Sequence, residues 1–431
     1  MSLAFSVCLV VLCAAAAMGM PIALAMIVSA VAYLAISGQD LALASEQLIQ
    51  SVYDSFVLLA VPLFIVAANI MNAGAISDRL LDFCKAMVGR FKGGLAQVDI
   101  LVSLIFSGMS GSAVADAAGV GKISIAMMLK TGHYTPGFAG AVVAASATIG
   151  PIIPPSIPMV LYALVSDASI GYLFLGGVIP GVLMTLVLMV MNSVIAHRRN
   201  IPAEEAVPLR RLPGITLRAM PALMMPVILL AGIYGGATTP TEAAAVAALY
   251  ALLVSGLFYR SLSLRALYDI FLDSSRSSAS VGLVIGSALI FNYIVATENI
   301  PTAISGALVE MDLSRMEFLL LVNVMFLLLG CVLDASTIIL VIIPLFLPTA
   351  AALGVDPIHF GVMSVVNCMI GLITPPYGML LFVINGVTGI AIKDMVKEGM
   401  PFLFALLTAL VALTLVPDLI LFLPRMFGYE G

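Results

Sequence analysis

The sequence SGMSGS at residues 107–112 and the sequence TIGPIIPPS at residues 148–156 each interrupt an apolar segment of this chain. A second pair of interruptions, GCVLDAST at residues 330–337 and GLITPPYG at residues 371–378, follows in the other half of the chain. In both pairs a small polar break, with an aspartate in it or close behind it, precedes a break rich in Gly or Pro. Paired, interrupted hydrophobic segments in corresponding halves are typical of the binding site of a secondary transporter.

The composition indicates a membrane protein. The chain is 62% hydrophobic and only 10% charged, whereas a soluble domain is roughly one quarter charged. In lipid every backbone polar group must be bonded within the chain, and apolar runs of about 20 residues fit helices about 30 Å long. We therefore predict an all-α polytopic membrane protein in the lipid bilayer. The five cysteines lack CxxC spacing and no basic run carries interleaved aromatics, so we expect neither a zinc site nor a nucleic-acid partner.

The order of the apolar segments predicts an inverted-topology repeat with about ten transmembrane helices and two re-entrant hairpins. The first repeat spans residues 1–196, a polar linker with five arginines spans 197–218, and the second repeat spans 219–431. The hairpins and broken helices are expected, in chain order, at 101–121 (hairpin), 138–165 (broken helix), 318–353 (hairpin) and 360–387 (broken helix).

Loop charges indicate that the two repeats are inverted, because Arg and Lys concentrate in short cytoplasmic loops. The segment before the first hairpin carries four basic residues, whereas its counterpart 310–317 has three acids and only Arg315. The balance of charge also reverses after each hairpin, since Lys122 and Lys130 follow the first hairpin and Asp356 follows the second. It reverses again after each broken helix, since Asp167 follows the first and Lys393 and Lys397 follow the second. These reversals predict a periplasmic N-terminus and a cytoplasmic linker.

Two aspartates, Asp116 and Asp334, lie deep in apolar sequence. A carboxylate at such a position costs at least ~2.5–3.5 kcal/mol unless it faces protein, water or a cation. We therefore expect both carboxylates to support an ion or substrate site. The alternative is that each one caps backbone N–H groups at a hairpin turn. The two roles can coexist, because a carboxylate that holds a loop also shapes the positions of its carbonyls.

Other oxygens surround the same breaks. Ser110 and Ser112 supply hydroxyls beside Gly111, which tolerates unusual backbone angles. Ser336 and Thr337 supply hydroxyls at the second break, and the prolines of the Gly/Pro-rich breaks leave carbonyls without their usual N–H partners. Such oxygens suit Na⁺, while the N-termini of half-helices attract an anion. Two packed proline kinks are the alternative, but kinks alone would not require polar, glycine-flanked breaks at both matched positions.

Motifs for covalent chemistry are missing from the sequence. The three histidines form no HExxH motif, and the residues around Gly121 and Lys122 do not complete a phosphate loop. The sequence TPTE at 239–242 predicts a helix start with a capping box, rather than an intramembrane role for Glu242. We therefore expect no enzyme and no resident cofactor, and the energy for transport would come from a gradient or from a partner protein.

Several of these segments together resemble the large membrane subunit of tripartite ATP-independent periplasmic (TRAP) transporters, the DctM/SiaM-like family. The similarity covers nearly the whole chain, and these motifs show no departure from the family pattern. The segments are SGSAVAD at 110–116, TIGPIIPPSIP at 148–158, TPTEA at 239–243, GCVLD at 330–334 and GLITPP at 371–376.

The resemblance implies a three-part system in the bacterial inner membrane. A periplasmic substrate-binding protein captures an organic acid, and a small four-helix membrane subunit buttresses the large one. The large subunit imports the acid together with Na⁺, the coupling ion, by an elevator-type motion of the hairpins and broken helices. The acid itself is not named by the sequence, because dicarboxylates, sialic acid, sugar acids and keto acids all fit.

The resemblance also implies individual site residues. Sodium would be bound by Ser110, Gly111, Asp116 and Gly150 in the first half, and by Gly330, Asp334, Thr337 and Thr374 in the second half. The substrate would be bound by Ser112, Pro154, Pro155, Ser156, Thr374 and Pro376.

Three other functions would each require further features in the sequence. A proton-coupled carboxylate carrier of the same fold, with Asp116 or Asp334 titrating, remains open. The permease of an ATP-driven importer would need a cytoplasmic docking loop, and the linker 197–218 has no recognisable coupling motif. An intramembrane enzyme would need a nucleophile and a base, and the sequence offers no such pair.

Overall fold

The computed structural model describes residues 2–54, 56–73 and 76–431, and every regular element in these ranges is a helix. Six of the described helices are long and apolar enough to cross a bilayer by themselves. They are α11 (Ile170–Arg198), α12 (Leu212–Tyr234), α13 with the π-helical η3 (Pro240–Phe258), α14 (Leu264–Thr297), α17 to α18 (Ala335–Ala352) and α21 (Ile392–Leu415). The prediction of an all-helical polytopic membrane protein is confirmed.

Shorter helices account for most of the rest of the described chain. The N-terminal ones are α1 (Leu3–Ala17), α2 (Ile22–Ser37), α3 (Ala42–Asp54), η1 (Phe56–Leu59), α4 (Ala60–Ala73) and α5 (Ile76–Val88). A short turn η2 (Leu209–Arg211) precedes α12, α15 (Ile300–Glu310) precedes the second hairpin, and α22 (Asp418–Met426) follows α21. Any crossings beyond the six long helices would have to be made by such shorter apolar helices.

Each half contains a hairpin followed by a broken helix. In the first half these are α6 (Gly94–Ser110), α7 (Ala113–Ala118) and α8 (Val120–Lys130), then α9 (Pro136–Ala147) and α10 (Ile157–Ser166). In the second half they are α16 (Arg315–Gly330), α17 (Ala335–Thr337), η4 (Ile338–Ile342) and α18 (Ile343–Ala352), then α19 (Pro357–Gly371) and α20 (Met379–Thr388). The same order of elements therefore occurs twice along the chain.

The breaks follow from local chemistry. At the first hairpin Gly111 takes the left-handed conformation with φ +59°, which ends α6, and Ser112 then caps the start of α7. At the second hairpin Asp334 caps α17. The two broken helices stop before their proline pairs, because proline lacks an N–H and disfavours helix in the residue before it. The breaks are thus encoded by Gly, Pro and capping residues.

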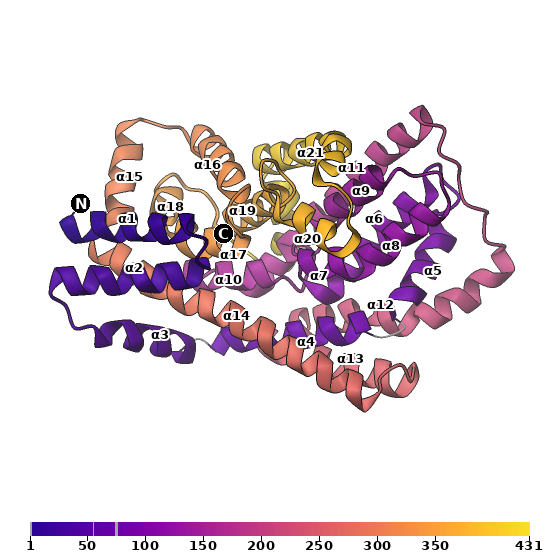
Figure 1. The fold of residues 1–431 in the computed structure, drawn as a ribbon, viewed down its shortest axis with the longest axis horizontal. Coiled ribbons are helices and arrows are strands. Elements are labelled where there is room, and N and C mark those ends of the chain that lie inside the picture. The colour runs from indigo at the N-terminus through magenta and orange to yellow at the C-terminus, as the bar shows by residue number, and fades with distance from the viewer. Residues whose placement is uncertain (1, 55, 74–75) are drawn as a thin grey trace.

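The hairpins and broken helices lie together, with longer helices packed beside them (Figure 1). The 34-residue α14 runs diagonally and packs on α2, α3 and α4, while α13 also packs on α4. Contacts between the halves are crossed: α7 of the first hairpin lies against α20, and α17 of the second hairpin lies against α10. Each hairpin turn therefore meets the helix that follows the break of the other half.

Some boundaries differ from those expected. The first hairpin is longer than 101–121, because its arms begin at Gly94 and end at Lys130, so that Lys122 lies on a helix. The linker is shorter than 197–218, since α11 continues through Arg198 and α12 begins at Leu212. Helices α3 and α15 were not expected, because neither sequence forms a long apolar run.

Candidate functional site

The first candidate half-site is built around the turn of the first hairpin, residues 110–116, which we call the first tip. Ser110 is the last residue of α6, and its hydroxyl donates a hydrogen bond to Oδ1 of Asp116 on α7. Asp116 is only 3% exposed and forms no ion pair among the described residues. Its second oxygen, Oδ2, is buried and has no hydrogen-bond partner. A buried polar atom without a partner is rare and marks a place where a ligand could bind.

The first tip is pressed against the break in the first broken helix. A Cβ atom on Gly150 would collide with Oδ2 of Asp116, and a Cβ on Gly111 would collide with the carbonyl oxygen of Pro155. A Cβ on Gly108 would collide with Pro226 on α12 instead, and the carbonyl oxygen of Pro154 is at ordinary contact distance from it. The absence of side chains at Gly150 and Gly111 therefore lets the first tip approach the first break closely.

The serines predicted to contact substrate act as helix caps. Ser112 accepts a hydrogen bond from the N–H of Ala115 at 3.4 Å, at the start of α7. Ser156 accepts one from the N–H of Met159 at 3.2 Å and donates its own proton to the carbonyl of Pro151. Both hydroxyls already have partners within the protein. Their oxygens nevertheless hold the two helix starts beside the first break.

The second candidate half-site lies at residues 330–337, the second tip, and its aspartate is bonded differently. Asp334 accepts hydrogen bonds from the N–H of Thr337 at 3.2 Å and from its hydroxyl at 2.5 Å. It is half-buried, and the N–H of Gly378 donates to the carbonyl of Cys331 at 3.4 Å, which ties the second break to this tip. Asp334 therefore acts as a helix cap, as the alternative interpretation of the sequence proposed.

Glycines again allow a close approach in the second half. A Cβ on Gly371 would lie 2.7 Å from the Cα of Gly330, so the hairpin and the broken helix touch backbone to backbone there. Thr374 donates its hydroxyl proton to the carbonyl of Ile370 at 2.8 Å, within its own helix, and Pro376 is exposed. Of the residues predicted for the second half, Gly330 lies at this contact, Asp334, Thr337 and Thr374 are bonded within their own segments, and Pro376 is exposed.

Sequence reasoning missed a second buried carboxylate in the first half of the chain. Asp99 lies on α6 and is 1% exposed; it accepts a hydrogen bond from the hydroxyl of Ser146 on α9 at 2.7 Å. It stands in a continuous helix, so no break drew attention to it. Its position in an apolar run was the only signal available.

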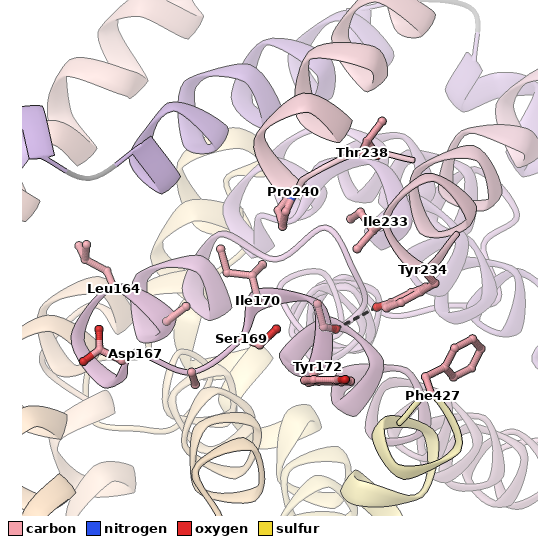
Figure 2. A pocket seen from close by; sticks show the side chains of 13 residues that line it. Leu164, Asp167, Ser169, Ile170, Tyr172, Ile233, Tyr234, Thr238, Pro240 and Phe427 are labelled. Carbon is pink, nitrogen blue, oxygen red and sulfur yellow. Dashed lines mark hydrogen bonds between the residues drawn. The ribbon is translucent and has the colours of Figure 1, made fainter. Parts of the chain in front are cut away.

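An open pocket of about 690 Å³ lies apart from both tips (Figure 2). Its lining comes from the end of α10, the start of α11, the end of α12 and the chain leading into α13, and Tyr234 crosses it to donate a hydrogen bond to the carbonyl of Gly171 at 3.0 Å. It contains none of the residues predicted for sodium or substrate.

Comparison with known proteins places this arrangement in a family. The model of the DctM component of the tripartite ATP-independent periplasmic transporter matches residues 9–419. The chain belongs to this DctM family. It is therefore a transport subunit and not an enzyme, and the family implies a small membrane subunit and a periplasmic binding protein as partners.

Relatives in the DctM family align with this chain over most of their length. The sialic acid TRAP transporter large permease protein SiaM of Vibrio cholerae is 38% identical over 95% of this chain and 96% of its own. The C4-dicarboxylate TRAP transporter large permease protein DctM of Pseudomonas aeruginosa is 41% identical over 87% of this chain and 88% of its own. The crystal structure of the Alcanivorax borkumensis YdaH transporter superposes with a TM-score of 0.63, at 15% identity, over 85% of this chain and 86% of that one. This last similarity concerns the fold alone.

Proposed function

We propose that this DctM-family subunit imports a small organic acid together with Na⁺, in complex with a small four-helix membrane subunit and a periplasmic substrate-binding protein. The observation that carries the proposal is the partnerless Oδ2 of Asp116, buried against the Gly150 break. A bare carboxylate oxygen among hydroxyls and carbonyls has the hard-oxygen character that Na⁺ prefers, as other hard cations do.

In the proposed site the first Na⁺ is held by Ser110, Gly111, Asp116 and Gly150, and the second by Gly330, Asp334, Thr337 and Thr374. The close approach of each tip to a glycine of its broken helix supports this grouping. Asp334 would contribute to the second ion while it caps α17, because a carboxylate oxygen can accept more than one contact.

The substrate is proposed to bind between the halves, near Ser112, Pro154, Pro155, Ser156, Thr374 and Pro376. The crossed contacts of α7 with α20 and of α17 with α10 support a location shared by both halves. Two relatives are named for sialic acid and for C4-dicarboxylates, and both substrates carry carboxylate groups. A small carboxylate is the class we propose, delivered by the binding protein.

We further propose a periplasmic N-terminus and an elevator-type movement of the hairpins and broken helices against the remaining helices. The reversals of loop charge between the halves support the orientation. The long diagonal α14 packs on α2, α3 and α4 and also contacts η4 and α17 of the second hairpin. In the proposal these helices form the static surface along which the second hairpin moves.

The test is uptake of labelled organic acids into liposomes that contain this subunit and its small partner, with the binding protein added. Uptake that requires both an inward Na⁺ gradient and the binding protein is the expected result. Uptake driven by a pH gradient without Na⁺ would replace the proposal with a proton-coupled carboxylate carrier. A panel of sialic acid, C4-dicarboxylates, sugar acids and keto acids then identifies the substrate.

A further inference from the structure

The inference concerns Asp99, which the proposed sodium and substrate sites do not use. Its carboxylate, on the first arm of the first hairpin, is only 1% exposed, and no described Lys, Arg or His forms an ion pair with it. The hydroxyl of Ser146 donates to it at 2.7 Å, and this hydroxyl also points to the carbonyl of Val143 at 3.1 Å. One shared hydroxyl proton is little compensation for a fully buried charge.

A second, independent feature lies beside this carboxylate. Ser124 on α8 is 1% exposed, and its hydroxyl lies near the Asp99 carboxylate but farther than a normal hydrogen bond, while no other group satisfies its Oγ. A buried helical serine has an easy alternative, because it can bond to a carbonyl of its own preceding turn. An oxygen without a partner, facing a carboxylate, is the arrangement that a bound ion between the two would satisfy.

In the second half, the hairpin arm is joined to the broken helix by uncharged side chains. Ser146 and Asn367 both lie four residues before the glycine of their break, Gly150 and Gly371. Where Ser146 reaches Asp99 on the first arm of its hairpin, Asn367 donates to the side-chain oxygen of Asn323 on the first arm of the other hairpin at 2.7 Å. Neutral amides therefore suffice to join a hairpin arm to a broken helix.

We propose that Asp99, Ser124 and Ser146 form an additional Na⁺ site between the two arms of the first hairpin and α9. Three helices, α6, α8 and α9, each contribute one oxygen-bearing side chain to it. The choice of Na⁺ rests on the proposed coupling ion, whereas the existence of the site rests on the buried Asp99 carboxylate, its bond from Ser146 and the unsatisfied Oγ of Ser124.

Binding of radioactive sodium to the purified subunit with its small partner tests the site directly. Asp99→Asn keeps the shape of the side chain and the bond from Ser146, and Ser124→Ala removes a hydroxyl that makes no hydrogen bond, so both variants should fold. We expect each to bind fewer sodium ions per chain at saturation or to need a several-fold higher Na⁺ concentration. Ser29→Ala, which changes a buried serine on α2 that donates to the carbonyl of Met26 and lies outside the hairpins and broken helices, is the matched control and should bind as the wild type does.

The outcomes separate the site from the proposed function. Wild-type sodium binding in both Asp99→Asn and Ser124→Ala overturns the site, and so does a variant in which only the pH dependence of uptake changes, because Asp99 would then exchange a proton. Uptake by the wild type that does not depend on Na⁺ overturns the proposed function. In that case, loss of sodium binding in Asp99→Asn would still support the site. A lower Hill coefficient for Na⁺ in the uptake of both variants supports the two together.

Discussion

The two hairpin tips occur in the same order of helices, but their aspartates have different hydrogen-bond partners. At the first tip Asp116 receives one bond, from Ser110, and keeps a buried oxygen free beside Gly150. At the second tip Asp334 is engaged by both the N–H and the hydroxyl of Thr337. An acid in a membrane hairpin is therefore not by itself an ion ligand, and the partners of its individual oxygens decide what it can bind.

The largest expected effect is a difference in folding stability between alanine variants of Gly371, in the second contact, and Gly150, in the first. In Gly371→Ala the new Cβ would meet the backbone of Gly330 at 2.7 Å, so the second hairpin cannot dock, and we expect a loss of about 1–3 kcal/mol of folding stability together with uptake. In Gly150→Ala the Cβ meets the movable end of Asp116, so uptake should be lost while the unfolding midpoint stays near that of the wild type.

Thermal unfolding and uptake of the two glycine variants, measured side by side, check this contrast. Gly386→Ala is the matched control, because a Cβ on this helical glycine meets no atom within 4 Å. Equal unfolding midpoints for Gly371→Ala and Gly150→Ala would contradict the difference between the two contacts.

Asp116→Asn should have the next largest effect. The variant keeps the bond from Ser110 but replaces a free carboxylate oxygen by an amide, and we expect the half-saturating Na⁺ concentration for uptake to rise at least about tenfold, equivalent to ~1.4 kcal/mol. The measurement is the Na⁺ dependence of initial uptake at saturating substrate. An unchanged Na⁺ dependence in a folded variant would remove Asp116 from the ion site.

Asp334 allows its capping role to be separated from ion binding. Because Asn caps helices as well as Asp, Asp334→Asn should unfold like the wild type, whereas Asp334→Ala should lose about 0.5–2 kcal/mol. We expect Asp334→Asn to raise the half-saturating Na⁺ concentration less than Asp116→Asn does, because Thr337 already occupies its oxygens. Should the Na⁺ dependence of Asp334→Asn match the wild type, Asp334 is a cap only.

The smallest effect concerns the capping box at the start of α13, which confirms the prediction for Glu242. The carboxylate of Glu242 accepts hydrogen bonds from the N–H of Thr239 at 2.8 Å and from its hydroxyl at 2.9 Å, and that hydroxyl accepts one from the N–H of Glu242 at 3.3 Å. Glu242→Ala removes one half of this capping box, so its unfolding midpoint should lie slightly below that of the wild type. An unchanged midpoint in thermal unfolding would contradict this.

Sequence alone was sufficient for the helical class, the four breaks and the family. Gly111, the proline pairs and the TPTE box signal their local structures directly, because each of these residues restricts or satisfies the backbone by itself. The partners of Asp116 and Asp334 could not be predicted, since both aspartates look alike in sequence and only the folded tips determine which oxygens stay free. Asp99 was missed because a residue inside an unbroken helix shows its buried environment only when α8 and α9 are in place.

The crossed contacts of α7 with α20 and of α17 with α10 have a consequence for how the two halves depend on each other. Each hairpin turn rests on a helix encoded in the opposite half, so a chain cut between α11 and α12 would yield two fragments that each lack one side of both tips. Such fragments should complement each other when they are co-expressed and should be inactive when they are expressed singly.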